Sequence, residues 1–325
     1  MTGQQIQVDL LIVGAGPTGL YAAYYAGFRG LEVAVIDALP EAGGQIAALY
    51  PEKLIYDVAG FPAVRGQDLV DALFEQACRW QPHFLLARSA VTVAHGPAGV
   101  EIGTDTGDTV RAKALLITAG IGNFVPRELP TGSDYLGRGL RYFVPKLTEL
   151  AGQDVVVVGG GDSAVDWALS LEPIARTVTL VHRRPAFRAH QRSVEQLLES
   201  SVRVLTSCEV VEVSGESAVE QVLVATRDQQ SVLLPAQAVV AALGFIADLG
   251  PIEAWGLQLR RRHVLVDRSM RTNLERIYAA GDIADYDGKV KLISIGFGEA
   301  ALAVNHIAHL IDPTISLAPG HSTDA

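Results

Sequence analysis

Apolar runs, glycine-rich segments and helical stretches follow the same order twice along the chain. Residues 8–13 form an apolar run, and a glycine-rich segment and an Ala- and Tyr-rich stretch then lead to a second apolar run at residues 33–36. Short uninterrupted apolar runs are typical of strands buried on both faces of a parallel sheet. We therefore predict a strand, a helix ending near residue 29 and a second strand, and the same order recurs over residues 155–182.

The first repeat places the pattern G-x-G-x-x-G between its strand and its helix, as Gly14-Ala15-Gly16-Pro17-Thr18-Gly19. Gly14 permits a tight turn, Gly16 lets a pyrophosphate approach the backbone, and Gly19 lets the helix pack closely on the strand. Pro17 suits the first helical position, and free N–H groups of the residues that follow it, such as Thr18, can hold the phosphates. Asp37 ends the second strand, where a carboxylate can bind a ribose hydroxyl. The first repeat thus predicts a dinucleotide site suited to a ribose diol, as in FAD.

The second repeat keeps this glycine pattern. Gly159, Gly161 and Ala164 stand 145 residues after the three glycines of the first repeat. Asp162 and Ser163 suit the first turn of a helix, where an acid or a hydroxyl can satisfy free N–H groups.

The charge after the second strand differs between the repeats. The 145-residue displacement carries Asp37 onto His182, and Arg183 and Arg184 follow directly, with Arg188 beyond a turn. Guanidinium groups bind phosphate bidentately, whereas a carboxylate would repel it. The second repeat therefore predicts an NADP(H) site whose arginines hold the adenosine 2′-phosphate. The alternative for each arginine is a solvated surface position.

Later segments indicate that the first unit is split in sequence. Residues 112–121 are predicted to form a strand entering a glycine turn, residues 272–285 a strand ending at Gly281-Asp282, and residues 298–310 an Ala-rich helix. The predicted fold class is α/β, with two Rossmann-like, three-layer ββα nucleotide-binding domains and the NADPH domain inserted into a split FAD domain. We expect FAD on residues 1–118 and 247–325 and NADP(H) on residues 119–246.

Composition and cysteine spacing argue against several classes of function. The net charge of −10 argues against a general nucleic-acid or membrane-surface binder. The two cysteines, Cys78 and Cys208, form neither a disulfide framework nor a C-x-x-C, and no metal site is expected. A polar N-terminus and the lack of long apolar runs predict a cytoplasmic protein without a signal peptide or membrane span.

Several motifs resemble the thioredoxin-reductase-like flavoproteins. They include "GGQ" at residues 43–45, "TAG" at 118–120, "HRRPAFRA" at 182–189 and "AAGDI" at 279–283. Thioredoxin reductases carry a C-x-x-C shortly before the second glycine motif, but this chain reads "RYFVPK" there, at residues 141–146. The dithiol chemistry is therefore absent.

A narrower resemblance covers essentially the whole chain. The segments "LYPEKLIYDVAGFP" (49–62), "GGGDSAVDWALSLEPIA" (159–175), "GFGEAALAVN" (296–305) and "GHSTD" (320–324) are similar to the thioredoxin-reductase-like ferredoxin (flavodoxin)–NADP+ reductases. The resemblance implies one FAD per chain, a homodimer, flavin stacking by Tyr50 on one face, and His321 of the partner subunit on the other. It also implies further FAD contacts at Gly44, Gln45, Val91, Phe124, Gly281, Asp282 and Thr323.

These features predict an oxidoreductase that passes electrons between NADP(H) and ferredoxin or flavodoxin, by hydride transfer to flavin N5. Two alternatives stay open: an NADPH diaphorase acting on quinones or other acceptors, and a flavin- and NADP-binding sensor with little turnover. An acidic ferredoxin would need a local basic surface. The candidates are Arg127, Arg138, Arg141 and Lys146, or residues 260–262.

Overall fold

The chain folds into two compact units, and it passes between them four times. The structure is a computed structural model and describes residues 3–226 and 230–318. Unit 1 comprises residues 1–48, 54–124 and 247–325, and unit 2 comprises residues 49–53 and 125–246. Residues 119–124 group with unit 1, where Asp248 N–H donates to Ile121 O (3.1 Å).

Unit 1 is built on a mixed sheet with the strand order β5-β2-β1-β8-β7-β6, in which β21 also pairs with β8. Strands β1, β2, β5, β8 and β21 run parallel, and β6 and β7 add an antiparallel extension. The strands of this sheet are β1 (Gln5–Val13), β2 (Val33–Ile36), β5 (His83–Leu85), β6 (Ala90–Gly96), β7 (Gly99–Thr104), β8 (Thr109–Ile117) and β21 (Ile277–Ala279).

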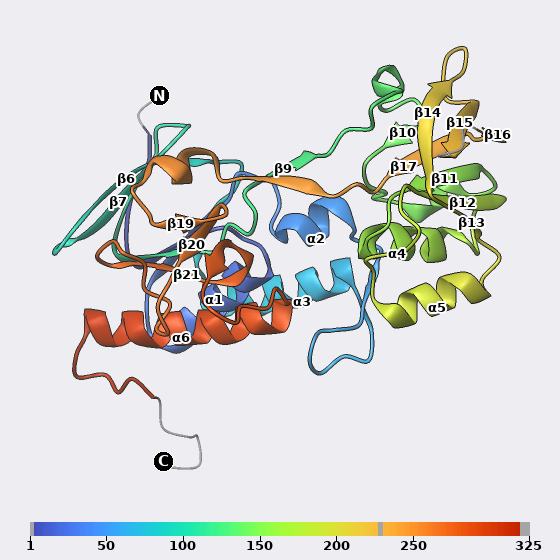
Figure 1. Cartoon of the computed structure of the whole chain (residues 1–325). Helices are drawn as coiled ribbons and strands as arrows, with labels where there is room; N and C mark the ends of the chain where they lie inside the picture. Colours follow the sequence, from blue (N-terminus) through green and yellow to red (C-terminus); the bar gives the residue numbers. More distant parts are fainter. Residues whose placement is uncertain (1–2, 227–229, 319–325) are drawn as a thin grey trace. The chain divides into compact units, whose positions relative to one another are not determined.

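Three layers make up unit 1. Three long helices lie on one side of the sheet, with α1 packed against both of the others (Figure 1). On the other face, sheet residues such as Val8 and Ile117 form one buried cluster with Trp255 and Val264 of the following segments. The helices are α1 (Pro17–Phe28), α3 (Gly66–Cys78) and α6 (Ile293–Ile311). The shorter elements are α2 (Gly44–Leu49), β3 (Leu54–Ile55), β4 (Val64–Arg65), β9 (Asn123–Pro126), β18 (Phe245–Asp248), η3 (Gly250–Ala254), β19 (Leu259–Arg260), β20 (His263–Leu265), η4 (Gly281–Ile283) and β22 (Ala284–Asp285).

Unit 2 repeats this layered plan around a parallel sheet with the order β10-β17-β11-β12-β13. Helices α4 and α5 lie on one side of this sheet, and an antiparallel sheet of β14, β15 and β16 lies on the other (Figure 1). Val155 and Val157 of β11 pack in the cluster with the helices, and Val156 and Val158 pack in the cluster with the antiparallel sheet. Its elements are η1 (Ser133–Tyr135), β10 (Leu140–Arg141), η2 (Leu147–Leu150), β11 (Asp154–Val158), α4 (Asp162–Leu171), β12 (Thr177–His182), α5 (Gln191–Glu199), β13 (Arg203–Thr206), β14 (Cys208–Ser214), β15 (Gln221–Thr226), β16 (Ser231–Pro235) and β17 (Ala238–Ala241).

The last helix begins earlier than the sequence predicts. We expected a start near residue 298, but α6 begins at Ile293. Gly296 and Gly298 lower the helical propensity of this turn, yet Gly296 has a packing reason. A Cβ on Gly296 would lie 2.4 Å from Thr18 Oγ1. Tertiary packing against α1 therefore overrides local propensity here.

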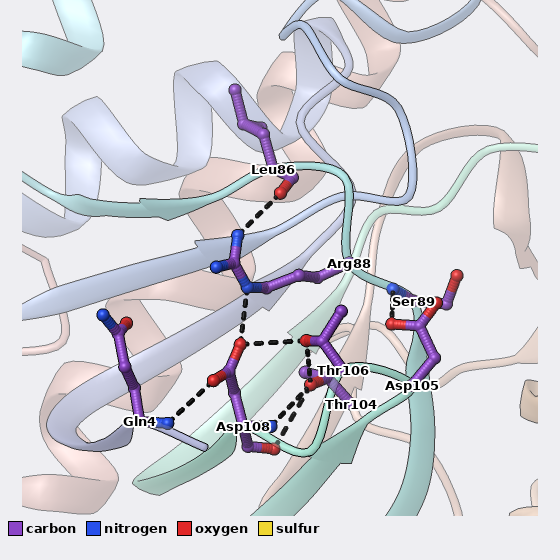
Figure 2. A network of polar contacts seen from close by, with 8 residues as sticks. All are labelled: Gln4, Leu86, Arg88, Ser89, Thr104, Asp105, Thr106 and Asp108. Atoms are coloured by element: carbon purple, nitrogen blue, oxygen red, sulfur yellow. Dashed lines mark hydrogen bonds and ion pairs between the residues drawn. The ribbon is translucent and has the colours of Figure 1, made fainter. Parts of the chain in front are cut away.

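A polar network in unit 1 joins the N-terminal strand to the turn between β7 and β8 (Figure 2). The Asp108 carboxylate accepts hydrogen bonds from Gln4 N–H (2.8 Å), Arg88 Nε (2.5 Å) and Thr106 Oγ1 (3.0 Å). Asp108 N–H in turn donates to Thr104 Oγ1 (3.0 Å). The network also fixes the side chain of Arg88, and the backbone N–H of Arg88 donates to Asp37 O (3.0 Å). The network therefore supports the segment around Asp37, beside the first candidate site.

We expect Asp108→Asn to lower the melting temperature at neutral pH and to flatten the acid limb of the stability curve. Gln4 N–H and the Arg88 guanidinium hold the pKa of the Asp108 carboxyl below its usual value. Because that pKa is depressed, the network stabilises the fold above the unfolded pKa of about 4, and this stability is lost as pH falls through the folded pKa. Thermal melts from pH 7 to pH 3 measure the effect. Asp105→Asn, in the same turn, is the control, and equal acid limbs for both variants would contradict the prediction.

Candidate nucleotide-binding sites

The glycine loop of unit 1 leaves no room for side chains where the sequence predicted tight packing. Gly14 adopts a φ of 112°, and a Cβ there would lie 2.6 Å from Thr118 O. A Cβ on Gly19 would lie 1.8 Å from Gly14 O, so the expected close packing of α1 on β1 is confirmed. Thr118 Oγ1 donates to Gly14 O (2.8 Å) and fixes the loop from the end of β8.

A second glycine turn lies beside this loop. Gly43 N–H donates to Ala15 O (2.8 Å), and a Cβ on Gly44 would lie 3.0 Å from Gly16 Cα. Gln45 reaches the same region, because a Cβ on Gly120 would lie 3.3 Å from Gln45 Nε2. Gly16 is the residue before α1 and has no side chain to cap the helix. The N–H groups of the first turn of α1 thus face a cradle made largely of backbone, which suits a pyrophosphate.

Asp37 lies at the carboxyl end of β2, next to the glycine loop. Its Oδ2 accepts from Ala15 N–H (2.5 Å) and its Oδ1 from Leu39 N–H (2.8 Å). Burial raises the pKa of the Asp37 carboxyl, and the two backbone N–H groups oppose this shift. An ionised carboxylate has about four acceptor positions, so two are left for a ribose diol.

The third part of this site is η4, which carries Asp282. A Cβ on Gly281 would lie 2.8 Å from Thr18 Oγ1, so the start of η4 packs directly on the start of α1. Gly281 N–H donates to Glu299 Oε2 (2.8 Å), and this bond is buried. The half-buried Asp282 is therefore held near the glycine loop by a carboxylate from α6.

Glu299 belongs to a buried charged cluster. Its Oε1 accepts from Tyr286 OH (2.7 Å) and pairs with Lys289 Nζ, and the Glu299 and Lys289 side chains are each 4% exposed. Lys289 Nζ also lies 5.5 Å from the centre of the Tyr286 ring. Burial and the nearby Glu299 raise the pKa of Tyr286 to about 12, which keeps its hydroxyl a donor. The cluster links α6 to the segment that follows η4.

Val91 occupies an irregular position in β6. The register with β7 shifts between Ala90 and Thr92, which makes Val91 the extra residue of a β-bulge, and its carbonyl accepts from Trp255 Nε1 (3.0 Å). Bulges commonly re-aim a residue next to a functional site. Three other expected FAD contacts cannot be placed: His321 and Thr323 lie outside the described residues, and so does the side chain of Phe124.

Tyr50 belongs to the short segment that groups with unit 2. Tyr50 packs against the cluster of α4 and its sheet, and Lys53 Nζ lies 5.6 Å from the centre of its ring. Lys53 pairs with Asp166 of α4, and Glu52 Oε2 accepts from Leu147 N–H (2.7 Å). Residues 49–53 are thus attached to unit 2 by charged side chains.

The glycine loop of unit 2 has the same construction. Gly159 has no room for a side chain, because a Cβ would lie 2.3 Å from Ala242 O. Gly161 precedes α4, and a Cβ on it would meet no described atom within 4 Å. Asp162 and Ser163 open α4 as predicted, and Ala164 is fully buried. The open backbone at Gly161 suits a second pyrophosphate.

The basic turn after β12 folds back on this glycine loop. Arg188 N–H donates to Gly160 O (2.8 Å), and His190 N–H donates to Asp162 Oδ1 (2.8 Å). Burial lowers the pKa of His182, and the nearby Arg184, Arg183 and Arg188 lower it further. The turn that carries the three arginines expected at the 2′-phosphate is therefore held beside the glycine loop by backbone hydrogen bonds.

Sequence reasoning missed several residues that build these sites. Thr118 and Glu299 fix the backbone of unit 1, and Arg88 supports the loop next to Asp37. A charged residue inside the apolar helical stretch "GFGEAALAVN" was the available signal for Glu299. Within the described parts of the chain, no cluster of His, Cys, Asp and Glu could hold a metal ion, and no helix is long and apolar enough to cross a membrane.

Two glycine-loop units, one followed by an acid and the other by a basic turn, define an α/β protein with two dinucleotide-binding folds. The chain belongs to the pyridine nucleotide-disulphide oxidoreductase family, whose model matches residues 8–303. This confirms the resemblance identified from the motifs.

Close relatives match over nearly their whole length. A protein named ferredoxin–NADP reductase from Nocardioides sp. is 59% identical over 99% of both chains. One of the same name from Frankia casuarinae is 60% identical over 97% of this chain and 98% of its own. Among solved structures, T. acidophilum thioredoxin reductase has a TM-score of 0.83 and 26% identity, covering 95% of this chain and 99% of its own. The predicted fold class is thereby confirmed.

Proposed function

We propose that this protein is a ferredoxin–NADP reductase with FAD on unit 1 and NADP(H) on unit 2. The observation that carries this proposal is the near-complete match, at 59–60% identity, to relatives of that name. The chain has only two cysteines, one exposed on α3 and one buried in β14, and they are 130 positions apart. A dithiol relay like that of thioredoxin reductases is therefore unavailable.

The residues of unit 1 fit FAD. The cradle at Gly16 and Gly44 accepts the pyrophosphate, the spare acceptor positions of Asp37 take the ribose diol, and Asp282 takes a ribityl hydroxyl. When bound, FAD supplies two-electron chemistry with NADP(H) and one-electron chemistry with the carrier. The protein contributes position rather than an acid or a base. Gly44, Gln45, Val91 and Phe124 are the other contacts proposed for unit 1. Flavin stacking by Tyr50, which groups with unit 2, and by the partner subunit's His321 rests on the resemblance alone.

Arg184→Ala should weaken NADPH binding by about 1.5–3 kcal/mol, the range for hydrogen bonds to charged groups, and spare NADH. Arg184 is half-buried, and its carbonyl accepts from Ser207 N–H (3.3 Å), so its backbone is fixed. Titration of the purified protein with both nucleotides measures the change. Arg192→Ala, on an exposed position of α5, is the matched control. Equal losses for NADPH and NADH would remove Arg184 from the phosphate site.

The proposed reaction is tested by steady-state turnover. Purified FAD-loaded protein should oxidise NADPH and reduce a ferredoxin, measured through cytochrome c, and should work poorly with NADH. Reduction of an artificial dye but not of ferredoxin or flavodoxin would favour the diaphorase alternative. No turnover with any acceptor would favour a flavin- and NADP-binding sensor.

Docking of an acidic ferredoxin needs a local basic surface, and the candidates are either residues of unit 2 or residues 260–262 of unit 1. Arg127, Arg138 and Lys146 are exposed, whereas Arg141 pairs with Glu149 and Arg260 pairs with both Asp285 and Asp287. Arg127, Arg138 and Lys146, and the exposed Arg261 of the alternative set, therefore stay the candidates for an acidic ferredoxin. Flavodoxin as a second partner and a cytoplasmic location stay predictions.

A homodimer fits the aromatic surface of α1. Tyr21, Tyr24, Tyr25 and Phe28 recur every three or four residues, neighbouring rings lie 6.0–6.3 Å apart, and Phe28 is 56% exposed. Aromatic side chains are enriched at the centres of interfaces. Phe28→Glu should turn a dimer into a monomer in light scattering, whereas Leu198→Glu on α5 should not. A dimer that persists in Phe28→Glu would place the interface elsewhere.

A further inference from the structure

His182 makes its contacts within the protein rather than with solvent. Its side chain is buried, with 7% of the residue exposed, and its ring stacks on Phe187 with centroids 5.2 Å apart and an interplanar angle of 19°. His182 Nε2 lies 3.1 Å from Ala186 O, and a neutral ring protonated at Nε2 donates to this carbonyl. The ring therefore spans the base of the turn that carries the three arginines.

The other contact of His182 is with the glycine loop. A Cβ on Gly160 would lie 2.0 Å from His182 Cε1, so the ring rests directly on the backbone of Gly160. Gly160 O also accepts from Arg188 N–H. This glycine is the unspecified middle position of G-x-G-x-x-A, and the histidine, not the nucleotide, accounts for its lack of a side chain.

The same pair of positions is coupled in unit 1 by different chemistry. The residues 145 positions earlier are Ala15 and Asp37, and there the Asp37 carboxylate accepts from Ala15 N–H. In both units the residue that ends the second strand holds the middle residue of the glycine loop. In unit 1, Asp37 keeps acceptor positions for a ribose. In unit 2, the His182 ring packs on Phe187 and on Gly160.

We infer that His182 is a positioning residue for NADPH selectivity, which locks the Arg183–Arg188 turn onto the glycine loop so that its guanidinium groups converge on the 2′-phosphate. It is not itself a phosphate ligand. The inference rests on the proposed NADP(H) site of unit 2. It assigns selectivity to the contact between the turn and the loop as well as to the charges of the arginines.

The test compares two probes that differ in the 2′-phosphate, 2′,5′-ADP and 5′-AMP, by calorimetric titration of the holoenzyme. His182→Phe keeps an aromatic ring between Phe187 and Gly160 but removes the donor to Ala186 O. We expect its Kd for 2′,5′-ADP to rise about tenfold, as for the loss of one well-placed hydrogen bond, with the Kd for 5′-AMP unchanged. His95→Phe, the same change at an exposed position of β6, should alter neither Kd.

Equal changes for both probes, or no change, would overturn the inference, because a merely structural role does not distinguish them. Phe187→Leu is a second variant that leaves His182 and the three arginines in place, and it should give a smaller loss confined to 2′,5′-ADP. If His182→Phe fails to fold, the result with Phe187→Leu decides. A wild-type protein that does not prefer 2′,5′-ADP would contradict the NADP(H) site itself, and ferredoxin turnover, measured separately, would then test the proposed function.

Discussion

Lys289→Met is expected to lower the free energy of unfolding by about 3–5 kcal/mol, the cost of leaving a buried charge without its partner. Lys289 and Glu299 are both almost fully buried, and Glu299 also accepts from Gly281 N–H and Tyr286 OH. Without the lysine, Glu299 must either stay charged in an apolar setting or take up a proton, and both cost stability. Denaturant unfolding of the apoprotein measures the loss.

The double variant Lys289→Met/Glu299→Gln is the control for this experiment. Glutamine keeps an oxygen for Gly281 N–H and offers an amide N–H to the Tyr286 oxygen, so most of the stability should return. FAD affinity should fall in the single variant and recover in the double one, because Glu299 holds the backbone next to Asp282. If the double variant were as unstable as the single one, the two charges would not be coupled.

Substitutions at two glycines of the first loop are expected to have different effects, one on the stability of the fold and the other on FAD binding. Gly19→Ala should destabilise the apoprotein by about 3 kcal/mol, because the new Cβ would overlap the Gly14 carbonyl and neither backbone can move freely. The helical preference for alanine, about 1 kcal/mol, offsets only part of this cost.

Gly16→Ala should behave in the opposite way. Its backbone is extended, with a φ of −72°, and a Cβ would come no closer than 4.0 Å to Gly44 Cα. Stability of the apoprotein should change by less than about 1 kcal/mol, whereas FAD affinity should fall at least about tenfold because the Cβ occupies the pyrophosphate cradle. Apoprotein melts and flavin fluorescence titrations measure both quantities. A Gly16→Ala protein that binds FAD normally would contradict the placement of the pyrophosphate.

Much of the fold follows from local sequence. The apolar run at residues 33–36 coincides with β2, and α4 begins at Asp162 as its glycine pattern predicted. Such features depend on period and turn chemistry within about ten residues. The displacement of 145 residues also identified which positions of the two units correspond, including Asp37 and His182.

The features that sequence did not predict depend on contacts between distant segments. Thr18 requires Gly281 and Gly296 to be small, and Glu299 reaches back to Gly281, so neither role is visible in one motif. The attachment of residues 49–53 to unit 2 likewise depends on the pairing of Lys53 with Asp166. Gly281 and Lys53 carry no local signal of these roles, and the charge of Glu299 within an apolar helical stretch does not identify its partners.

Anaerobic stopped-flow mixing tests the central claim most directly, because it resolves the two halves of the proposed reaction. The FAD-loaded protein is mixed with NADPH or NADH while flavin absorbance is followed, and the reduced protein is then mixed with oxidised ferredoxin. We predict fast bleaching with NADPH, much slower bleaching with NADH, and reoxidation by ferredoxin. Equal rates with both nucleotides, or a reduced flavin that does not react with ferredoxin, would contradict the account.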